Sequence, residues 1–263
     1  MKIFPLLSLL VFSLSMYGGG VTASVYLKNG RELEVSELAA DSSGNLTFIL
    51  DGDKYLLPER MWDYVKMPKP GLVESADKML ADKHYREAAD VFKVLAEKYK
   101  YQGWHTYCQL KRAEALQKIN QPSELISLLE SAVAEKPRGS EMEINARINM
   151  CFMLAEFYMQ TGKISEAEAL FDEVTDADDD ILAAKSYNAK GDILLQRGDD
   201  QRAILAYMRP VIMFPHGVKS REYSLAQIVQ LMGKNNDKRQ SIYLEILKNE
   251  YPDSEHIKKL TKQ

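Results

Sequence analysis

The chain has 263 residues, of which 46% are hydrophobic, and it carries 34 basic against 38 acidic residues. Its formal net charge of −4 is small and the charges are scattered along the chain, so composition gives no electrostatic basis for binding nucleic acid. The length is sufficient to bury a hydrophobic core.

The first segment, residues 1–23, has the pattern of a secretory signal. Lys2 gives a positive start, an uncharged and mostly apolar run extends from Ile3 to Tyr17, and three glycines precede a cleavage site after Ala23. We therefore expect a soluble periplasmic or secreted protein with no membrane span after cleavage. An uncleaved anchor is the alternative, although the apolar run is shorter than the roughly 20 residues that a span needs.

Residues 24–68 predict a small antiparallel β module. Asn29 and Gly30 favour a tight hairpin turn between two alternating segments. Further turn signals divide the following strand-forming residues, and Pro58 ends the last of these strands because proline removes a ladder donor. We expect the next residues to dock the module onto the first helices: Met61, Trp62, Tyr64 and Val65.

The remainder, residues 69–263, has a helical hydrophobic period. Pro68 and Pro70 mark the boundary, because each proline disfavours helix in the residue before it. Short breaks rich in Gly, Asn and Pro then divide the segment into about ten helices. A run of this kind predicts internal repeats.

The clearest repeat is residues 184–217. Small residues are expected where two helices cross closely, a glycine where the first helix ends in a left-handed conformation, and a proline where the second helix stops. An aromatic residue between them fills the gap between hairpins. These places are occupied by Gly191, Gly198, Ala203, Tyr207 and Pro215.

The same frame fits four further segments, which start at residues 69, 106, 148 and 221. Residues 148–181 match best, and Lys83 and Asn120 stand in the glycine place of the first two segments. The matching residues include Ala76, Ala88, Phe92, Ala113, Leu116, Leu129, Pro137, Ala155, Tyr158, Gly162, Ala167, Phe171, Leu231, Leu244 and Pro252. An unrelated helical bundle with chance matches is the alternative.

This spacing resembles the tetratricopeptide repeat. The resemblance implies a mainly α protein, an α-α superhelical solenoid of about five hairpins preceded by the β module. The ending of the last repeat, from Tyr251 to Ser254, also resembles repeats of secreted bacterial cell-envelope proteins. Fold is implied strongly and function weakly, because one fold hosts many functions.

No residue set argues for catalysis, a cofactor or a metal. His105 and Cys108 are three apart, but a zinc site needs about four ligands. The acidic cluster at residues 176–180 lacks the glycine turn and distal glutamate of a calcium loop, so we interpret it as a solvated loop. Cys108 and Cys151 are expected to be buried thiols, and a disulfide between them is the alternative.

In tetratricopeptide repeat proteins, the first helix of each hairpin lines a concave groove through its places 2, 5, 9 and 12. Place 9 is acidic in four successive repeats and becomes Val229 in the fifth. The predicted groove residues are Asp77, Tyr107, Leu110, Glu114, Asn149, Phe152, Glu156, Met159, Lys185, Asn188, Asp192 and Leu195.

The resemblance thus implies a non-catalytic scaffold or adaptor of the cell envelope. An acidic row beside apolar surface would suit a partner peptide or helix with basic and apolar anchors. Acids that are merely solvated are the alternative interpretation of the row. A structural subunit that uses the repeats to self-associate is the alternative function.

Overall fold

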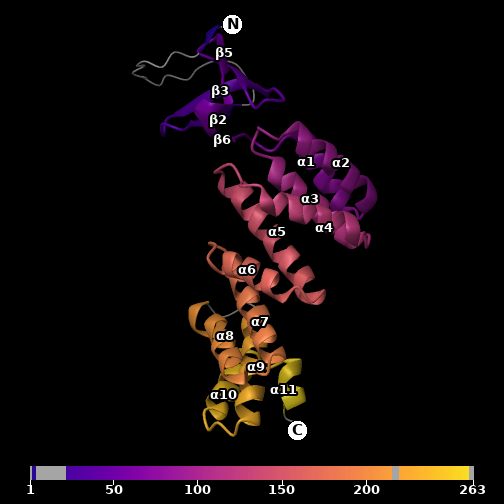
Figure 1. Cartoon of the computed structure of the whole chain (residues 1–263), viewed down its shortest axis with the longest axis vertical. Helices are drawn as coiled ribbons and strands as arrows, with labels where there is room; N and C mark the ends of the chain where they lie inside the picture. The colour runs from indigo at the N-terminus through magenta and orange to yellow at the C-terminus, as the bar shows by residue number, and fades with distance from the viewer. Residues whose placement is uncertain (1, 4–21, 215–218, 261–263) are drawn as a thin grey trace. The chain divides into compact units, whose positions relative to one another are not determined.

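The computed structural model describes residues 2–3, 22–214 and 219–260. It is mainly helical and begins with a small sheet, so the predicted fold class is confirmed (Figure 1). By its internal contacts the chain divides into two compact units, Met1–Arg147 and Ile148–Gln263. Each unit is described separately.

The sheet belongs to the first unit and has the strand order β1-β5-β4-β3-β2-β6. Strands β2 to β6 pair antiparallel, whereas β1 pairs parallel with β5. The strands are β1 (Lys2–Ile3), β2 (Ala23–Leu27), β3 (Glu32–Ala40), β4 (Leu46–Leu50), β5 (Asp53–Leu57) and β6 (Trp62–Lys66), with a short 3-10 helix at Glu59–Met61.

Turn chemistry sets the register of the sheet. Asp51 and Gly52 both have positive φ and join β4 to β5 in two residues, as a type I′ hairpin requires. The turn at Gly30 is looser, since Leu27 N–H donates to the Arg31 carbonyl around it. A bulge at Glu37, where φ is +50°, shifts the pairing of β3 with β4.

The segment from Met61 to Val65 differs from its prediction. Instead of only docking the module, most of it forms the edge strand β6, and Trp62 and Val65 lie in the core of the sheet. Docking follows from this strand. The Trp62 ring meets Tyr101 edge-on, with centroids 6.4 Å apart. A Cβ on Gly103 would lie 2.3 Å from the Val65 carbonyl oxygen, so only glycine fits at this approach.

Eleven α-helices are found in the described residues, and ten of them form the five predicted hairpins (Figure 1). The pairs are α1 (Gly71–Ala81) with α2 (Tyr85–Lys98), α3 (His105–Lys118) with α4 (Pro122–Ala134), α5 (Glu141–Gln160) with α6 (Ile164–Thr175), α7 (Asp180–Gln196) with α8 (Asp200–Met213), and α9 (Lys219–Lys234) with α10 (Gln240–Glu250). The short α11 (Glu255–Leu260) follows.

All five hairpins turn in the same way. The second residue after the first helix has positive φ in each hairpin, at Lys83, Asn120, Gly162, Gly198 and Asn236. In every case its N–H donates to the carbonyl three residues earlier, and the next N–H donates to the carbonyl five residues before it. This is the Schellman ending of a helix. Four of these residues match the predicted frame, whereas the fifth lies one residue later, so the last repeat starts at residue 222.

The places that the repeat reserves for small and aromatic residues form the hairpin cores. Ala76, Ala88 and Phe92 are completely buried together in the first hairpin. In the fourth hairpin, Ala203 and Tyr207 occupy the same places and are also completely buried. Burial of this kind supplies most of the stability of short helices.

The 42-residue step between the second and third repeats has a structural cause. Helix α5 has 20 residues and begins at Glu141, seven residues before the frame start at residue 148. The extra residues therefore lengthen the helix rather than a loop. The division between the two units falls within this helix.

Most of the predicted signal, residues 1–23, lies outside the described residues. Ala23, its predicted last residue, is the buried first residue of β2 and pairs with Val35. Among the helices of the described residues, none combines the length and the apolar character that a membrane span requires. Cys108 and Cys151 are both buried thiols.

Candidate interaction surfaces

We call the twelve predicted groove residues the first-helix row. All of them lie on first helices of hairpins, namely α1, α3, α5 and α7. The structure shows, however, that several of the acids in this row already have partners within the protein. These partners decide which members are available to another molecule.

Asp77 is occupied in the first unit. Its carboxylate lies 2.6 Å from Lys69 Nζ, and both of its oxygens lie 3.0 Å from the Tyr107 hydroxyl, which donates to it. Burial and the nearby carboxylate raise the pKa of Tyr107 to about 12. Lys69 also lies over the Tyr107 ring, 5.1 Å from its centroid.

Asp192 is occupied in the second unit. Its Oδ1 accepts hydrogen bonds from the hydroxyls of Tyr207 at 2.6 Å and Tyr223 at 2.8 Å. Burial, followed by the hydrogen bond to Asp192, raises the pKa of both tyrosines far above the ordinary value. One carboxylate therefore links α7, α8 and α9.

These contacts follow one rule, which we call the acid ladder. In the first and fourth repeats, the acid at place 9 accepts a hydrogen bond from the residue at place 2 of the next repeat. Asp77 accepts from Tyr107, and Asp192 accepts from Tyr223, which stands at place 2 once the last frame starts at residue 222. Between them, Glu156 stands at place 9 and Lys185 at place 2: burial raises the pKa of Glu156, and the positive charge of Lys185 offsets part of that rise. The ladder is a device that joins neighbouring hairpins.

Four residues differ from what a groove requires. Leu110 is 9% exposed and Phe152 is 8% exposed, and Phe152 packs edge-on against Phe171. Asn188 is buried because its amide donates to the Ser220 carbonyl and its oxygen accepts from the Ser224 hydroxyl. Val229 is completely buried because the corrected frame puts it at place 8, where helices cross.

Glu114 and Glu156 are the remaining acids of the row. Glu114 is paired on its own helix with Lys111 Nζ at 2.9 Å. Glu156 is half-buried, and no described residue donates a hydrogen bond to its carboxylate. Burial raises the pKa of Glu156 and is the largest influence on it. The positive charge of Lys185 offsets part of this rise.

The rest of the row is exposed to different degrees. Met159 and Leu195 stand at the same place of successive repeats and are half-buried, as is Asn149. Lys185 is exposed, and its ammonium group lies 5.7 Å from the centroid of the Phe152 ring. The available part of the row in the second unit is therefore Glu156, Met159, Lys185 and Leu195.

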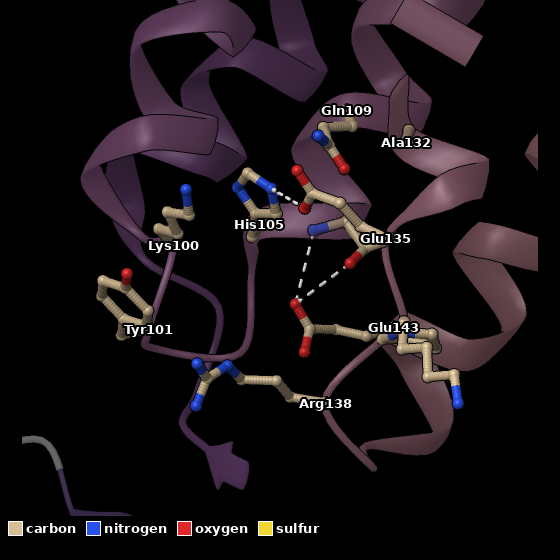
Figure 2. Close-up of a pocket in the computed structure, with 11 residues that line it drawn as sticks. Lys100, Tyr101, His105, Gln109, Ala132, Glu135, Arg138 and Glu143 are labelled. Atoms are coloured by element: carbon tan, nitrogen blue, oxygen red, sulfur yellow. Dashed lines mark hydrogen bonds and ion pairs between the residues drawn. The ribbon is translucent and has the colours of Figure 1, made fainter. Parts of the chain in front are cut away.

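The first unit contains a cleft that the repeat pattern does not predict (Figure 2). It has a volume of about 240 Å³ and lies between the α2–α3 loop, α3 and the end of α4. His105 at its centre is 8% exposed, and its Nδ1 lies 2.9 Å from the Ala96 carbonyl. Its Nε2 faces Glu135 Oε2 at 3.4 Å and has no hydrogen-bond partner among the described residues.

Glu143 forms the floor of this cleft. It is 3% exposed, and its Oε1 accepts from the backbone N–H and the hydroxyl of Thr106, both at 3.3 Å. Burial raises the pKa of Glu143 above its ordinary value, against the lowering effect of the Thr106 backbone hydrogen bond and of nearby positive charge. Arg138 at the rim pairs with Glu59 at 3.0 Å and covers the Trp62 ring.

The two other candidate sites of the sequence have structural roles. Cys108 packs into the core of the first hairpins, and burial raises the pKa of its thiol to about 12. In the acidic cluster, Asp179 caps α7 by accepting from the N–H groups of Ile181 and Leu182. A set of three or more His, Cys, Asp or Glu side chains that could hold a metal ion is not found among the described residues.

A sequence signal for the cleft exists but is weak. His105, Gln109 and Arg112 recur at helical spacing on one side of α3, and polar stripes of this kind usually face solvent. Here all three line one continuous depression. Only the neighbouring helices α2 and α4, which the stripe itself does not reveal, turn it into a cleft.

Comparison with known proteins supports the resemblance over part of the chain. Residues 126–193, from α4 into α7, match the family model described as tetratricopeptide repeat. No curated protein matches the sequence. Among solved structures, the chain is similar to the apo form of the quorum sensor NprR from B. thuringiensis, with a TM-score of 0.55 and 16% identity over 72% of this chain.

That alignment covers 56% of the NprR chain, so this protein spans little more than half of the length of that structure. A second similar structure is a Podosopora anserina putative kinesin light chain with nearly identical TPR-like repeats, at a TM-score of 0.49 and 18% identity over 68% of this chain and 92% of that chain. Identities this low concern the fold alone.

Proposed function

We propose, from the premise that this chain contains tetratricopeptide repeats, that it is a non-catalytic adaptor that holds a segment of another protein. The observation that carries the proposal is the run of five hairpins with one repeated turn geometry. Helical repeats of this type present extended surfaces along their first helices, and they use these surfaces for binding. The binding surface that we propose is the available part of the first-helix row in the second unit.

Glu156 determines the chemistry of the partner. Its carboxylate is half-buried and lacks a donor from the described residues, so a Lys or Arg side chain would restore the hydrogen bonds that burial removes. Met159 and Leu195 supply apolar surface at one place of successive repeats. A helix or extended peptide with basic and apolar anchors fits this combination.

We place the adaptor in the cell envelope as part of the same proposal. The signal pattern of residues 1–23 and the ending from Tyr251 to Ser254 support this setting.

Self-association is a second candidate function, and one observation favours it. Helix α8 exposes Leu205 and Ile212, at 62% and 75%, on the outer side of a second helix. Exposed apolar side chains on one helix face are common at protein contacts. This face differs from the first-helix row, so the two candidates predict different contact positions.

The proposed surface is tested by reversing the charge of Glu156. The partner is first identified by crosslinking in the native envelope. Glu156→Lys is then expected to weaken its binding by at least about tenfold, because the proposed half-buried pair between Glu156 and a basic side chain of the partner is replaced by repulsion between two positive charges. Isothermal titration calorimetry measures the affinity. The matched control is Glu166→Lys on the exposed face of α6. Equal affinity in both variants would contradict the proposed surface.

A further inference from the structure

The cleft of the first unit lies on the side of α3 opposite to the first-helix row. At about 100° per residue, the stripe of His105, Gln109 and Arg112 is centred about 180° from the stripe of Tyr107 and Glu114. The cleft of about 240 Å³ adjoins a second one of about 390 Å³ along α3, and both are lined by His105, Gln109, Lys100 and Glu135. A site here is therefore separate from the proposed adaptor surface.

The hydrogen bonds of His105 fix its tautomer. The Ala96 carbonyl can only accept, so Nδ1, at 2.9 Å, must carry the proton and donate to it. In a neutral imidazole the other nitrogen, Nε2, is then an acceptor. This nitrogen is completely buried and has no hydrogen-bond partner in the described part of the chain.

A carboxylate oxygen faces this nitrogen. Glu135 Oε2 lies 3.4 Å away and is itself an acceptor. With a neutral imidazole, the lone pairs of His105 Nε2 and Glu135 Oε2 therefore face each other without a proton between them. Figure 2 shows Glu135, Gln109 and Glu143 directed toward the same space as His105. A buried acceptor without a donor, as His105 Nε2 is here, carries a desolvation cost, which a ligand with an N–H group would remove.

Three positive side chains also line the cleft, namely Lys100, Lys136 and Arg138. Arg138 is held by Glu59 at 3.0 Å and lies over the rings of Trp62 and Tyr101. Arg112 forms an ion pair with Glu124 in the adjoining cleft. Lys100 and Lys136 are exposed, and water and salt screen exposed charges strongly. The charged group that faces His105 Nε2 itself is therefore the Glu135 carboxylate.

We propose that this cleft binds an organic cation, a primary ammonium or guanidinium group. The cation donates to His105 Nε2 and Glu135 at the same time and lies over Glu143. A carboxylate or phosphate ligand lacks donors for these three groups and would be repelled by two carboxylates. The cation is either a free small amine or a Lys or Arg side chain of a bound polypeptide that continues along α3 toward Arg112.

The test is a titration of the full chain, with its histidines labelled with ¹⁵N, using N-acetyl-arginine methylamide and N-acetyl-lysine methylamide. Imidazole ¹⁵N shifts at about pH 8, where free imidazole is neutral, identify the tautomer and follow binding at Nε2. We expect the Nδ1–H tautomer and a saturable shift of His105 alone, whereas the exposed His84 stays unchanged. The neutral probe N-acetyl-glutamine methylamide is expected to cause no shift.

Two variants complete the test. Glu135→Gln is expected to weaken the shift-derived affinity about tenfold or more, because it removes one charge-assisted hydrogen bond. Glu135 is half exposed, with a side-chain exposure of 52%, so this variant keeps the core intact. Glu87→Gln, on the exposed face of α2, is the matched control and should bind as the parent does.

Several results would overturn the proposal. They are a doubly protonated His105 that ignores all probes, equal shifts with the neutral probe, or a shift with acetate but not with the cations. Among supporting results, tighter binding of the pentapeptide acetyl-Gly-Gly-Arg-Gly-Gly-amide than of the blocked arginine assigns the site to a polypeptide side chain. Equal affinity of the two assigns it to a free amine.

Discussion

Replacing Asp192 by alanine is expected to lower the free energy of unfolding by about 3 kcal/mol. The hydroxyls of Tyr207 and Tyr223 both donate to Asp192 Oδ1, and Tyr207 is completely buried. Without the carboxylate, two hydroxyls in a largely buried place lose their acceptor, and each such loss costs about 1–3 kcal/mol. Urea denaturation followed by far-UV circular dichroism measures the change.

Two variants separate this effect from a general loss of charge. Asp192→Asn keeps a carbonyl oxygen as acceptor, so we expect it to recover part of the stability. Asp200→Ala removes a carboxylate whose partner Lys234 is 65% exposed, and ion pairs at the surface contribute only about 0–1 kcal/mol. If Asp192→Ala and Asp200→Ala change stability equally, the acid ladder does not join the hairpins.

Gly191→Ala is the second change with a large expected effect. A Cβ at this place would lie 2.5 to 2.8 Å from three atoms of the buried Tyr207 ring. The ring cannot move freely because its hydroxyl is bonded to Asp192 at 2.6 Å. We expect a loss of about 2 kcal/mol, since overpacking costs about 1–3 kcal/mol while alanine in a helix returns up to about 1 kcal/mol.

The matched control for this variant is Gly71→Ala. Gly71 is the first residue of α1, and a Cβ there would meet no atom within 4 Å. Alanine is the better helix former, so Gly71→Ala should leave stability unchanged or raise it by up to about 1 kcal/mol. The midpoints of thermal and urea denaturation should therefore fall for Gly191→Ala and should stay unchanged or rise for Gly71→Ala. A stabilised Gly191→Ala would mean that the fourth hairpin is packed less closely than the structure shows.

The hairpins could be predicted because each repeat contains its own short-range sequence pattern of small, aromatic and helix-ending residues. Ala88 and Phe92 lie on one face of α2, and the left-handed residue at Lys83 ends α1 at the expected place. These signals depend on neighbours three to fifteen residues away, which a single sequence displays. The sequence frame of the last repeat lies one residue too early, because Asn235 and Asn236 are chemically equivalent candidates for the left-handed place and the positive φ is at Asn236.

The partners of the acids could not be predicted in the same way. Asp77 and Tyr107 are 30 residues apart, and Asp192 and Tyr223 are 31 apart. A frame shows that these residues stand at places 9 and 2, but not that their side chains meet. The prediction of an acidic groove therefore counted four similar carboxylates, whereas the structure distinguishes Glu156 from the others by its lack of a donor.

Strand β6 and the cleft at His105 escaped prediction for a related reason. Trp62 and Val65 have the spacing of either a strand or a docking segment, and pairing with β2 decides between them. His105 lies on a polar stripe whose depth depends on α2 and α4. In both cases the deciding contact comes from another element of the chain.

The central claim, an adaptor that uses its first helices, is tested most directly by photo-crosslinking in the native cell envelope. A photoreactive amino acid at Met159 on α5 is compared with one at Leu205, 62% exposed on α8. The adaptor predicts a discrete crosslink from position 159 to another protein, lost in Glu156→Lys, and none from position 205. A crosslink from position 205 to a second copy, with none from position 159, would contradict it.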